Sequence, residues 1–174
     1  MEPTLVLPVP PTIERARHLR VPTPLAERVL VLTSPGRRGF WCTTTGLREF
    51  GLPELQIHRV PRAVVVPWSW ILTGLALRLL ELWAEAVRRS DGGFALLPAR
   101  VELTADDCAR AYGERGPGAR RVGLTLRFDP SPNMRGDGFL TVRPPPSRDR
   151  SAVLVEICDR LFDRVPREPR AGLR

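Results

Sequence analysis

"FWCTTTGLREFGLPELQIHRV", residues 40–60, holds two strand-like runs separated by a bend. Three threonines and Gly46 end the first run, and a Gly-Leu-Pro-Glu-Leu passage leads into the second. Glycine adopts backbone dihedrals that other residues resist, and proline fixes φ just before the second run. Glu54 has a carboxylate that can accept hydrogen bonds from the N–H groups of the bend. The stretch therefore predicts an antiparallel hairpin of residues 40–45 and residues 54–60.

The midpoint of this hairpin, near Glu49, predicts which residues face each other across the two strands. The expected pairs are Phe40 with His58, Cys42 with Gln56, and Thr44 with Glu54. Side chains alternate along a strand, so these six residues are expected to share one face. The opposite, more apolar face is expected to meet the helices and contains Trp41, Thr43, Leu55 and Ile57.

This register would place a thiol, an imidazole and a carboxylate together. A thiolate nucleophile needs a neighbouring base and an orienting group, so Cys42, His58 and Glu54 are the candidate catalytic residues. The candidate ligand-binding residues are Thr43, Thr44, Thr45, Gln56 and Trp70. In the structural alternative, which the sequence favours, Cys42 is buried and inert. Glu54 then binds backbone N–H groups of the bend.

The same stretch resembles the signature of bacterial domain families of unknown function, T-x-G-L followed by G-x-P-E-L. The matching residues are Thr44, Gly46, Leu47, Gly51, Pro53, Glu54 and Leu55. Some members have an aromatic residue before the first threonine or a histidine before the proline, where this chain has Cys42 and Leu52 nearby. The resemblance implies the hairpin and a following helix, and it implies no activity.

Hydrophobic periodicity predicts the remaining elements. Apolar residues spaced by three and four predict a helix over residues 67–89 and a second over residues 151–165. Trp70 lies off the apolar face of the first helix. Thr104 is expected to cap a short helix, and several alternating runs predict strands. We therefore expect a single α+β domain over residues 1–165, with a mixed, mostly antiparallel sheet and both long helices on one face.

Further short elements and a tail are expected elsewhere in the chain. A short edge strand is expected at residues 4–9, a helical turn at residues 13–19 and a strand at residues 27–34. Residues 94–103 predict a strand interrupted at Pro98. Residues 166–174 are rich in arginine and proline and predict a flexible tail.

The charge of the chain comes from arginine. The net charge is +8, all 27 basic residues are arginine, and Asn133 is the only asparagine. Lysine also contacts phosphate well, so binding chemistry would not require its complete replacement. No recognised nucleic acid motif accompanies the arginines, and we expect no tight, sequence-specific binding to DNA or RNA.

Several other classes of protein are disfavoured. Cys42, Cys108 and Cys158 are widely spaced, which argues against a disulfide framework and a structural zinc site. No metal site and no cofactor are expected. The N-terminal residues do not resemble a secretory signal, and the longest apolar run is too short to span a bilayer. We expect a cytoplasmic protein without membrane insertion.

No catalytic motif with a known geometry appears in the chain. The sequence favours a non-enzymatic accessory or protein-interaction domain, with a protein partner or a second copy as the binding partner. The alternative is a small enzyme or ligand-binding protein that uses the Cys42, Glu54 and His58 face. A second alternative is nucleic acid binding driven by arginine.

Overall fold

A computed structural model describes residues 2–10, 20–90, 93–131 and 138–162. These residues form an α+β domain, as predicted. The strands are β1 (Thr4–Pro8), β2 (Leu30–Gly36), β3 (Gly39–Thr45), β4 (Glu54–Val60), β5 (Phe94–Pro98), β6 (Arg100–Thr104), β7 (Arg121–Pro130) and β8 (Gly138–Arg143). The α-helices are α1 (Val65–Arg89), α2 (Ala105–Ala111) and α3 (Arg150–Leu161). The expected helical turn at residues 13–19 and the expected tail at residues 166–174 lie outside the described residues.

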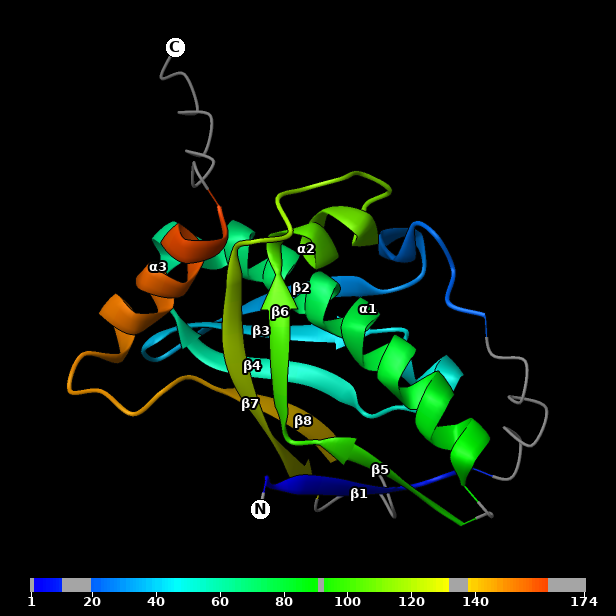
Figure 1. Cartoon of the computed structure of the whole chain (residues 1–174). Coiled ribbons are helices and arrows are strands. Elements are labelled where there is room, and N and C mark those ends of the chain that lie inside the picture. The colour runs from blue at the N-terminus through cyan, green and yellow to red at the C-terminus, as the bar shows by residue number, and fades with distance from the viewer. Residues whose placement is uncertain (1, 11–19, 91–92, 132–137, 163–174) are drawn as a thin grey trace.

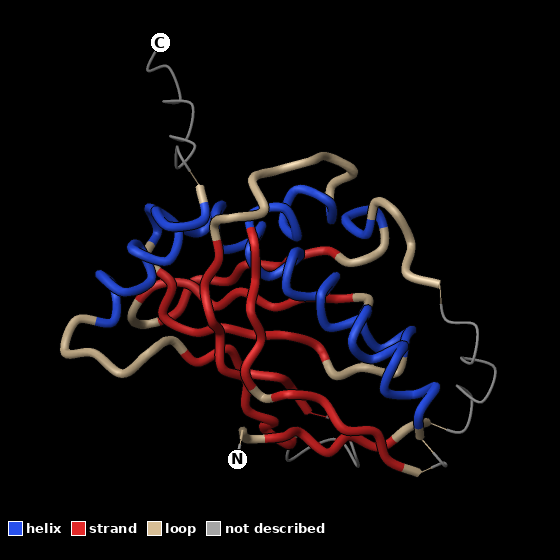
Figure 2. Tube along the Cα trace, in the orientation of Figure 1, coloured by secondary structure: helices blue, strands red, loops and turns tan. Residues whose placement is uncertain are grey.

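The described strands form two sheets (Figures 1 and 2). The main sheet has six strands in the order β2-β3-β4-β8-β7-β6, and the ribbon is the separate pair β1-β5. Every neighbouring pair is antiparallel except β4 and β8, which are parallel. The predicted pairing of β3 with β4 is confirmed, and β2 is an outer strand of the main sheet.

Helix α1 forms the centre of the core. It runs unbroken from Val65 to Arg89, as predicted, with Pro67 in its first turn, where a missing N–H has no consequence. Trp68 and Trp83 are fully buried, and their indole N–H groups donate to the carbonyls of Leu154 and Phe50. By length and composition this helix could cross a membrane, but 67% of its apolar window is buried inside the protein, as in a core helix.

Helix α2 packs very closely against α1. A Cβ atom at Gly74 of α1 would lie 2.7 Å from both the Cα and the Sγ of Cys108 in α2. The N-terminus of α2 carries a capping box, because Thr104 and Asp107 each accept a hydrogen bond from the other's backbone N–H. The cap predicted at Thr104 is thus confirmed, and glycine at position 74 explains how close the two helices lie.

Two expected boundaries differ in detail. Strand β2 begins at Leu30 rather than at residue 27, because Leu25–Glu27 form a turn of 3-10 helix. The strand predicted across Pro98 divides there, so that β5 joins the ribbon and β6 joins the main sheet. Proline has no N–H for a sheet hydrogen bond, and this break is the expected consequence.

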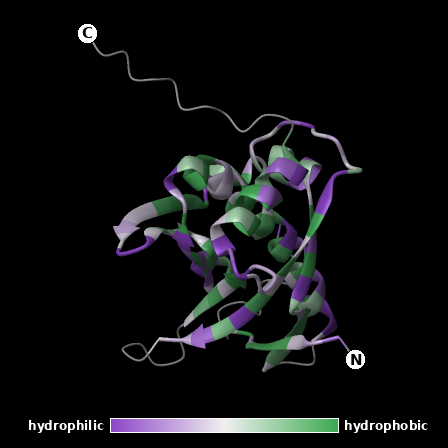
Figure 3. Ribbon diagram, turned by 90° about the vertical axis from the view of Figure 1, so that its left-hand side faces the viewer, coloured by the Kyte–Doolittle hydropathy of each residue, from purple (hydrophilic) through white to green (hydrophobic). Residues whose placement is uncertain are grey.

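The main sheet has one covered face and one open face. Helix α1 packs on the first face, with α2 against α1 and with α3 held to α1 through Trp68 (Figure 1). Hydrophobic and hydrophilic residues alternate along the strands in Figure 3. None of the helices among the described residues lies on the opposite face, which we call the open face. The prediction that the helices pack on one face is confirmed.

Candidate functional site

The bend after β3 is held together by Glu54. Its Oε2 accepts from the Thr44 hydroxyl at 2.7 Å, and its Oε1 accepts from the backbone N–H groups of Gly46 and Arg48 at 2.9 and 3.2 Å. Thr44 in turn accepts from the N–H of Leu55 at 2.9 Å. Glu54 is buried, so these hydrogen bonds replace its contacts with water. Both oxygens of the carboxylate are therefore used to hold the bend.

The glycines of the signature are required by the backbone. Gly46 has φ 117° and Gly51 has φ 84°, both in the left-handed region that favours glycine. A Cβ atom at Gly46 would also lie 2.3 Å from the carbonyl oxygen of Arg28. The residues Gly46, Gly51 and Glu54 therefore have an architectural role in this structure.

The predicted register of the hairpin is wrong by one residue. Cys42 lies opposite Ile57, not Gln56, and the pairing shifts again between Phe40 and Cys42. A slip of one residue moves side chains to the opposite face of a sheet. Cys42 is therefore fully buried on the covered face, and burial raises the pKa of its thiol to about 11.

The predicted catalytic grouping is consequently not assembled. Cys42 lies on the covered face, His58 is exposed on the open face, and Glu54 is bonded to the bend. Thr44 is buried with Glu54. Thr43 and Gln56 lie opposite each other on the open face, and Gln56 is buried there as well. Among the described residues, no group of three or more His, Cys, Asp or Glu side chains is placed to hold a metal ion.

The open face carries an aromatic cluster that the sequence did not predict. The rings of Trp41 and His58 stack with centroids 5.5 Å apart, and Phe139 meets Trp41 edge-on at 6.4 Å. Burial, followed by the charge of Arg150, lowers the pKa of His58 below its ordinary value. Trp41 was expected on the covered face, and the register shift explains its position on the open one.

A polar ladder crosses the middle of the open face. The Gln56 amide donates to the Thr141 hydroxyl at 2.9 Å, and Thr141 donates to Asp129. Arg127 donates to the other oxygen of Asp129 at 2.8 Å. Burial raises the pKa of Asp129, but the hydrogen bonds from Thr141 and Arg127 outweigh it and leave the pKa below its usual value. These side chains satisfy one another, so the ladder is a fixed polar surface.

The outer strand β2 presents apolar side chains on the same face. Leu32 pairs with Thr43, and Leu30 with Thr45. The side chains of Leu30 and Leu32 are 54% and 57% exposed, and that of Trp41 is 38% exposed. Strand β2 pairs with β3 on one edge, and no other described strand pairs with it. Its exposed leucines and unpaired edge form an accessible apolar feature of the open face.

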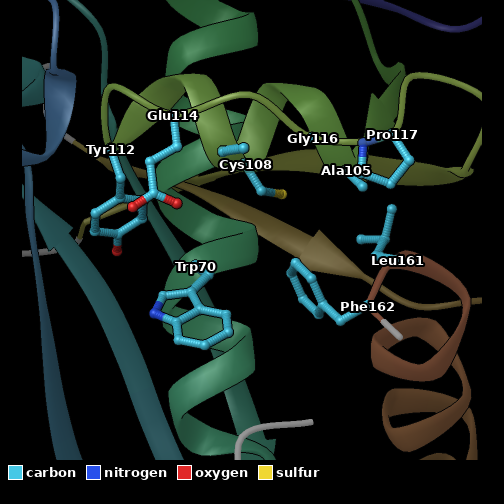
Figure 4. A pocket seen from close by; sticks show the side chains of 10 residues that line it. Trp70, Ala105, Cys108, Tyr112, Glu114, Gly116, Pro117, Leu161 and Phe162 are labelled. Carbon is cyan, nitrogen blue, oxygen red and sulfur yellow. The ribbon is translucent and has the colours of Figure 1, made fainter. Parts of the chain in front are cut away.

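Trp70 has a different environment from the hairpin residues. It meets Phe162 edge-on with ring centroids 5.5 Å apart and lines a pocket of about 410 Å³ between α1, α2 and the end of α3 (Figure 4). The walls are mainly apolar and include the Cys108 thiol, whose pKa burial raises to about 12. The predicted ligand-binding residues therefore do not form one site, because Trp70 is separate from Thr43 and Gln56.

The comparisons with known proteins gave no relatives. No protein-family model matches the chain, and no curated protein and no solved structure matches it.

Proposed function

We propose that the protein is a non-enzymatic interaction domain that assembles with a second copy through strand β2. The observation that carries this proposal is the unpaired edge of β2 next to exposed leucines. Unpaired N–H and C=O groups on an edge form a template for another strand. Exposed apolar side chains beside such an edge are typical of an interaction surface.

The composition of β2 supports this proposal. Soluble proteins usually protect an edge strand with charged side chains. The seven residues of β2, LVLTSPG, include no charged side chain. Pro35 lies near the end of the strand and leaves the first half free to pair. The first half of β2 therefore lacks the charged side chains that usually prevent pairing, which supports its pairing with a strand of a second copy.

Two copies can meet with twofold symmetry. In an antiparallel pairing centred on Leu32, the two copies of that residue face each other, and Leu30 faces Ser34 of the second copy. Residues that lie opposite each other on paired strands have their side chains on the same side of the sheet. Both exposed leucines would then be shielded on the open face of one continuous sheet. A twofold contact uses the same surface on both copies, so the proposal needs no partner other than a second copy of this chain.

The test is the oligomeric state measured by sedimentation equilibrium over a range of protein concentrations. The wild-type protein is expected to be a dimer at the higher concentrations, and Leu32→Arg is expected to be a monomer, because a charge on each copy would face its equivalent. The matched control is Leu96→Arg in the ribbon, where the leucine is 62% exposed and the charge change is the same. This control is expected to remain dimeric.

Two results would contradict the proposal. The first is a wild-type protein that is monomeric at every concentration. The second is dissociation by Leu96→Arg with no effect of Leu32→Arg, which would place the contact on the ribbon. Circular dichroism of each variant establishes that the fold is retained, which is expected because both leucines are exposed.

A further inference from the structure

Five arginines surround a hollow at the end of β8, where the chain leaves the main sheet and passes to α3. The hollow has a volume of about 810 Å³. The arginines that line it are Arg59, Arg100, Arg143, Arg148 and Arg150. They come from β4, β6, β8, the β8–α3 connection and α3, so the fold gathers side chains that are distant in sequence. Three consecutive prolines, residues 144–146, form one wall.

Arg150 lines this hollow and is anchored to the end of β4. One Nη atom donates to the carbonyl of His58 at 2.6 Å, which fixes the side chain across the end of β4. Its Nε atom is buried and has no partner among the described residues. Buried polar atoms are nearly always hydrogen-bonded, so this nitrogen is an exception among the described residues.

Arg59 reaches the hollow through an unusual backbone conformation. It has φ 55°, which is uncommon for a residue other than glycine. Simple alternation would place Arg59 on the covered face with Ile57, yet its side chain is exposed and lines the hollow. Backbone strain of this kind is concentrated at functional sites. The strained residue here adds a positive charge to the cluster.

Arg100 depends on a glycine for its position. A Cβ atom at Gly123 would lie 2.6 Å from an Nη atom of Arg100 and 2.8 Å from its Nε atom. The guanidinium therefore lies directly against the bare backbone of β7. Its ion pair with Glu102 is 3.6 Å long and more than half exposed, so it contributes little.

The cluster has few neutralising charges, although Asp129 is close enough to Arg143 for the two charges to interact. Among the described residues, no carboxylate lies within ion-pair distance of Arg59, Arg143 or Arg148. Burial, followed by the charges of Arg59 and Arg143, lowers the pKa of Arg150. Like charges held together destabilise the folded protein unless an anion is bound between them.

We propose that this hollow binds a small molecule that carries two or more phosphoryl groups. Guanidinium groups match the geometry of phosphoryl oxygens and donate paired hydrogen bonds to them. Five guanidiniums exceed what a single monoanion would require. The volume lies within the usual range of small-molecule sites, and the arginines converge on one hollow instead of following a stripe. This site is independent of strand β2 and of the proposed dimer.

The test is isothermal titration calorimetry with inorganic tripolyphosphate as the probe, at low and at physiological ionic strength. The expected result is saturable binding of one probe per chain. Arg143→Gln and Arg148→Gln are each expected to weaken binding by about tenfold, the effect of losing one hydrogen-bonded charge. Gly123→Ala is expected to weaken binding as well, because the new Cβ displaces the Arg100 guanidinium.

The matched control is Arg160→Gln, which removes the same charge from an exposed side chain of α3 that pairs with Glu156 outside the hollow. It is expected to change the dissociation constant by less than about twofold, since an exposed distant charge is screened. Without the probe, Arg148→Gln is expected to leave the melting temperature unchanged or raise it, because a repulsive charge is removed. A structural role for Arg148 would lower it.

Four results would overturn the proposal. The first is the absence of saturable binding. The second is an equal loss of binding in Arg160→Gln, which would indicate attraction to net charge only. The third is equally tight binding of citrate, which would assign the hollow to carboxylates. The fourth is a single-stranded oligonucleotide that binds more tightly than tripolyphosphate and depends on the same arginines, which would assign the hollow to nucleic acid.

Discussion

At the scale of single residues, Glu54 has the best defined role in the molecule. It accepts three hydrogen bonds while almost wholly buried, two from N–H groups of the bend between β3 and β4 and one from the Thr44 hydroxyl at the end of β3. We expect Glu54→Ala to lower the free energy of unfolding by about 1–3 kcal/mol, because buried donors are left without an acceptor. Urea denaturation of the two proteins measures this difference.

Glu49→Ala is the control for this variant, because Glu49 is an exposed carboxylate in the same bend. It is expected to unfold at nearly the same urea concentration as the wild-type protein. An unchanged stability of Glu54→Ala would show that the bend does not depend on its carboxylate.

The three cysteines give a second prediction at this scale. Burial raises the pKa of Cys42 to about 11 and, with smaller contributions from nearby acidic groups, those of Cys108 and Cys158 to about 12. The unfolded chain loses these protons near pH 8.5, whereas the folded chain retains them. Stability from this source is therefore complete below about pH 8.5 and is lost as the pH rises toward 11 and 12.

Iodoacetamide labelling checks the same assignment. Native protein at pH 7 to 9 is expected to react slowly at all three cysteines, and urea-unfolded protein rapidly, because the thiolate is the reactive species. Fast native labelling of Cys42 with a midpoint below its ordinary pKa would contradict the burial described here. A free energy of unfolding that rises between pH 8.5 and 10 would contradict the direction of the pKa shifts.

Residue-level prediction from the sequence succeeded where backbone chemistry was decisive. The roles of Gly46, Gly51 and Glu54 follow from the φ angles and the acceptors that a tight bend requires. The cross-strand register failed at the bend, because Cys42 pairs with Ile57 and Thr43 with Gln56, so the hairpin is not centred on Glu49. An irregularity between Phe40 and Cys42 then shifts the pairing again. Alternation of residue types does not reveal such an irregularity, since Trp41 and Cys42 both suit a buried position.

At the scale of elements, the close contact between α1 and α2 requires glycine at position 74, although glycine is a poor helix former. Replacing glycine by alanine inside a helix normally stabilises a protein by about 0.5–1 kcal/mol. At Gly74 the added Cβ would overlap backbone atoms of Cys108, which cannot move aside independently. We expect Gly74→Ala to be destabilising by about 1–3 kcal/mol, the range of overpacked cores. Thermal unfolding measures the sign directly.

Gly118→Ala is the control for the helix contact, because nothing lies within 4 Å of a Cβ atom at that position. Its melting temperature is expected to stay close to that of the wild-type protein. A higher melting temperature for Gly74→Ala would show that α1 and α2 can separate at little cost, and the close packing would then be incorrect.

The elements themselves were largely predictable from the sequence. The period of the apolar residues defined α1, and Thr104 identified the start of α2. The division at Pro98 was visible, but its consequence was not, because the sequence does not show that β5 and β6 join different sheets. That assignment depends on long-range pairing with β1 and β7.

At the scale of the whole molecule, the described helices lie on one face of the main sheet and leave the other face without a covering helix. The fold class was predictable because strands and helices have different periods of apolar residues, and both kinds of segment occur along the chain. The arginine hollow was not, because its five arginines are spread from residue 59 to residue 150 and meet only in the folded chain. Residues 143–150, which hold three arginines and three consecutive prolines, were the one local signal of it.

The central claim is that a second copy pairs with the free edge of β2, and amide hydrogen exchange tests it most directly. Free edge N–H groups exchange readily, whereas N–H groups paired with another strand are protected. We predict that the amides of Leu30–Gly36 that point away from β3 become more protected as protein concentration rises, while those of the ribbon strand β5 do not change. Exchange in Leu30–Gly36 that is equally fast at every concentration would contradict the claim.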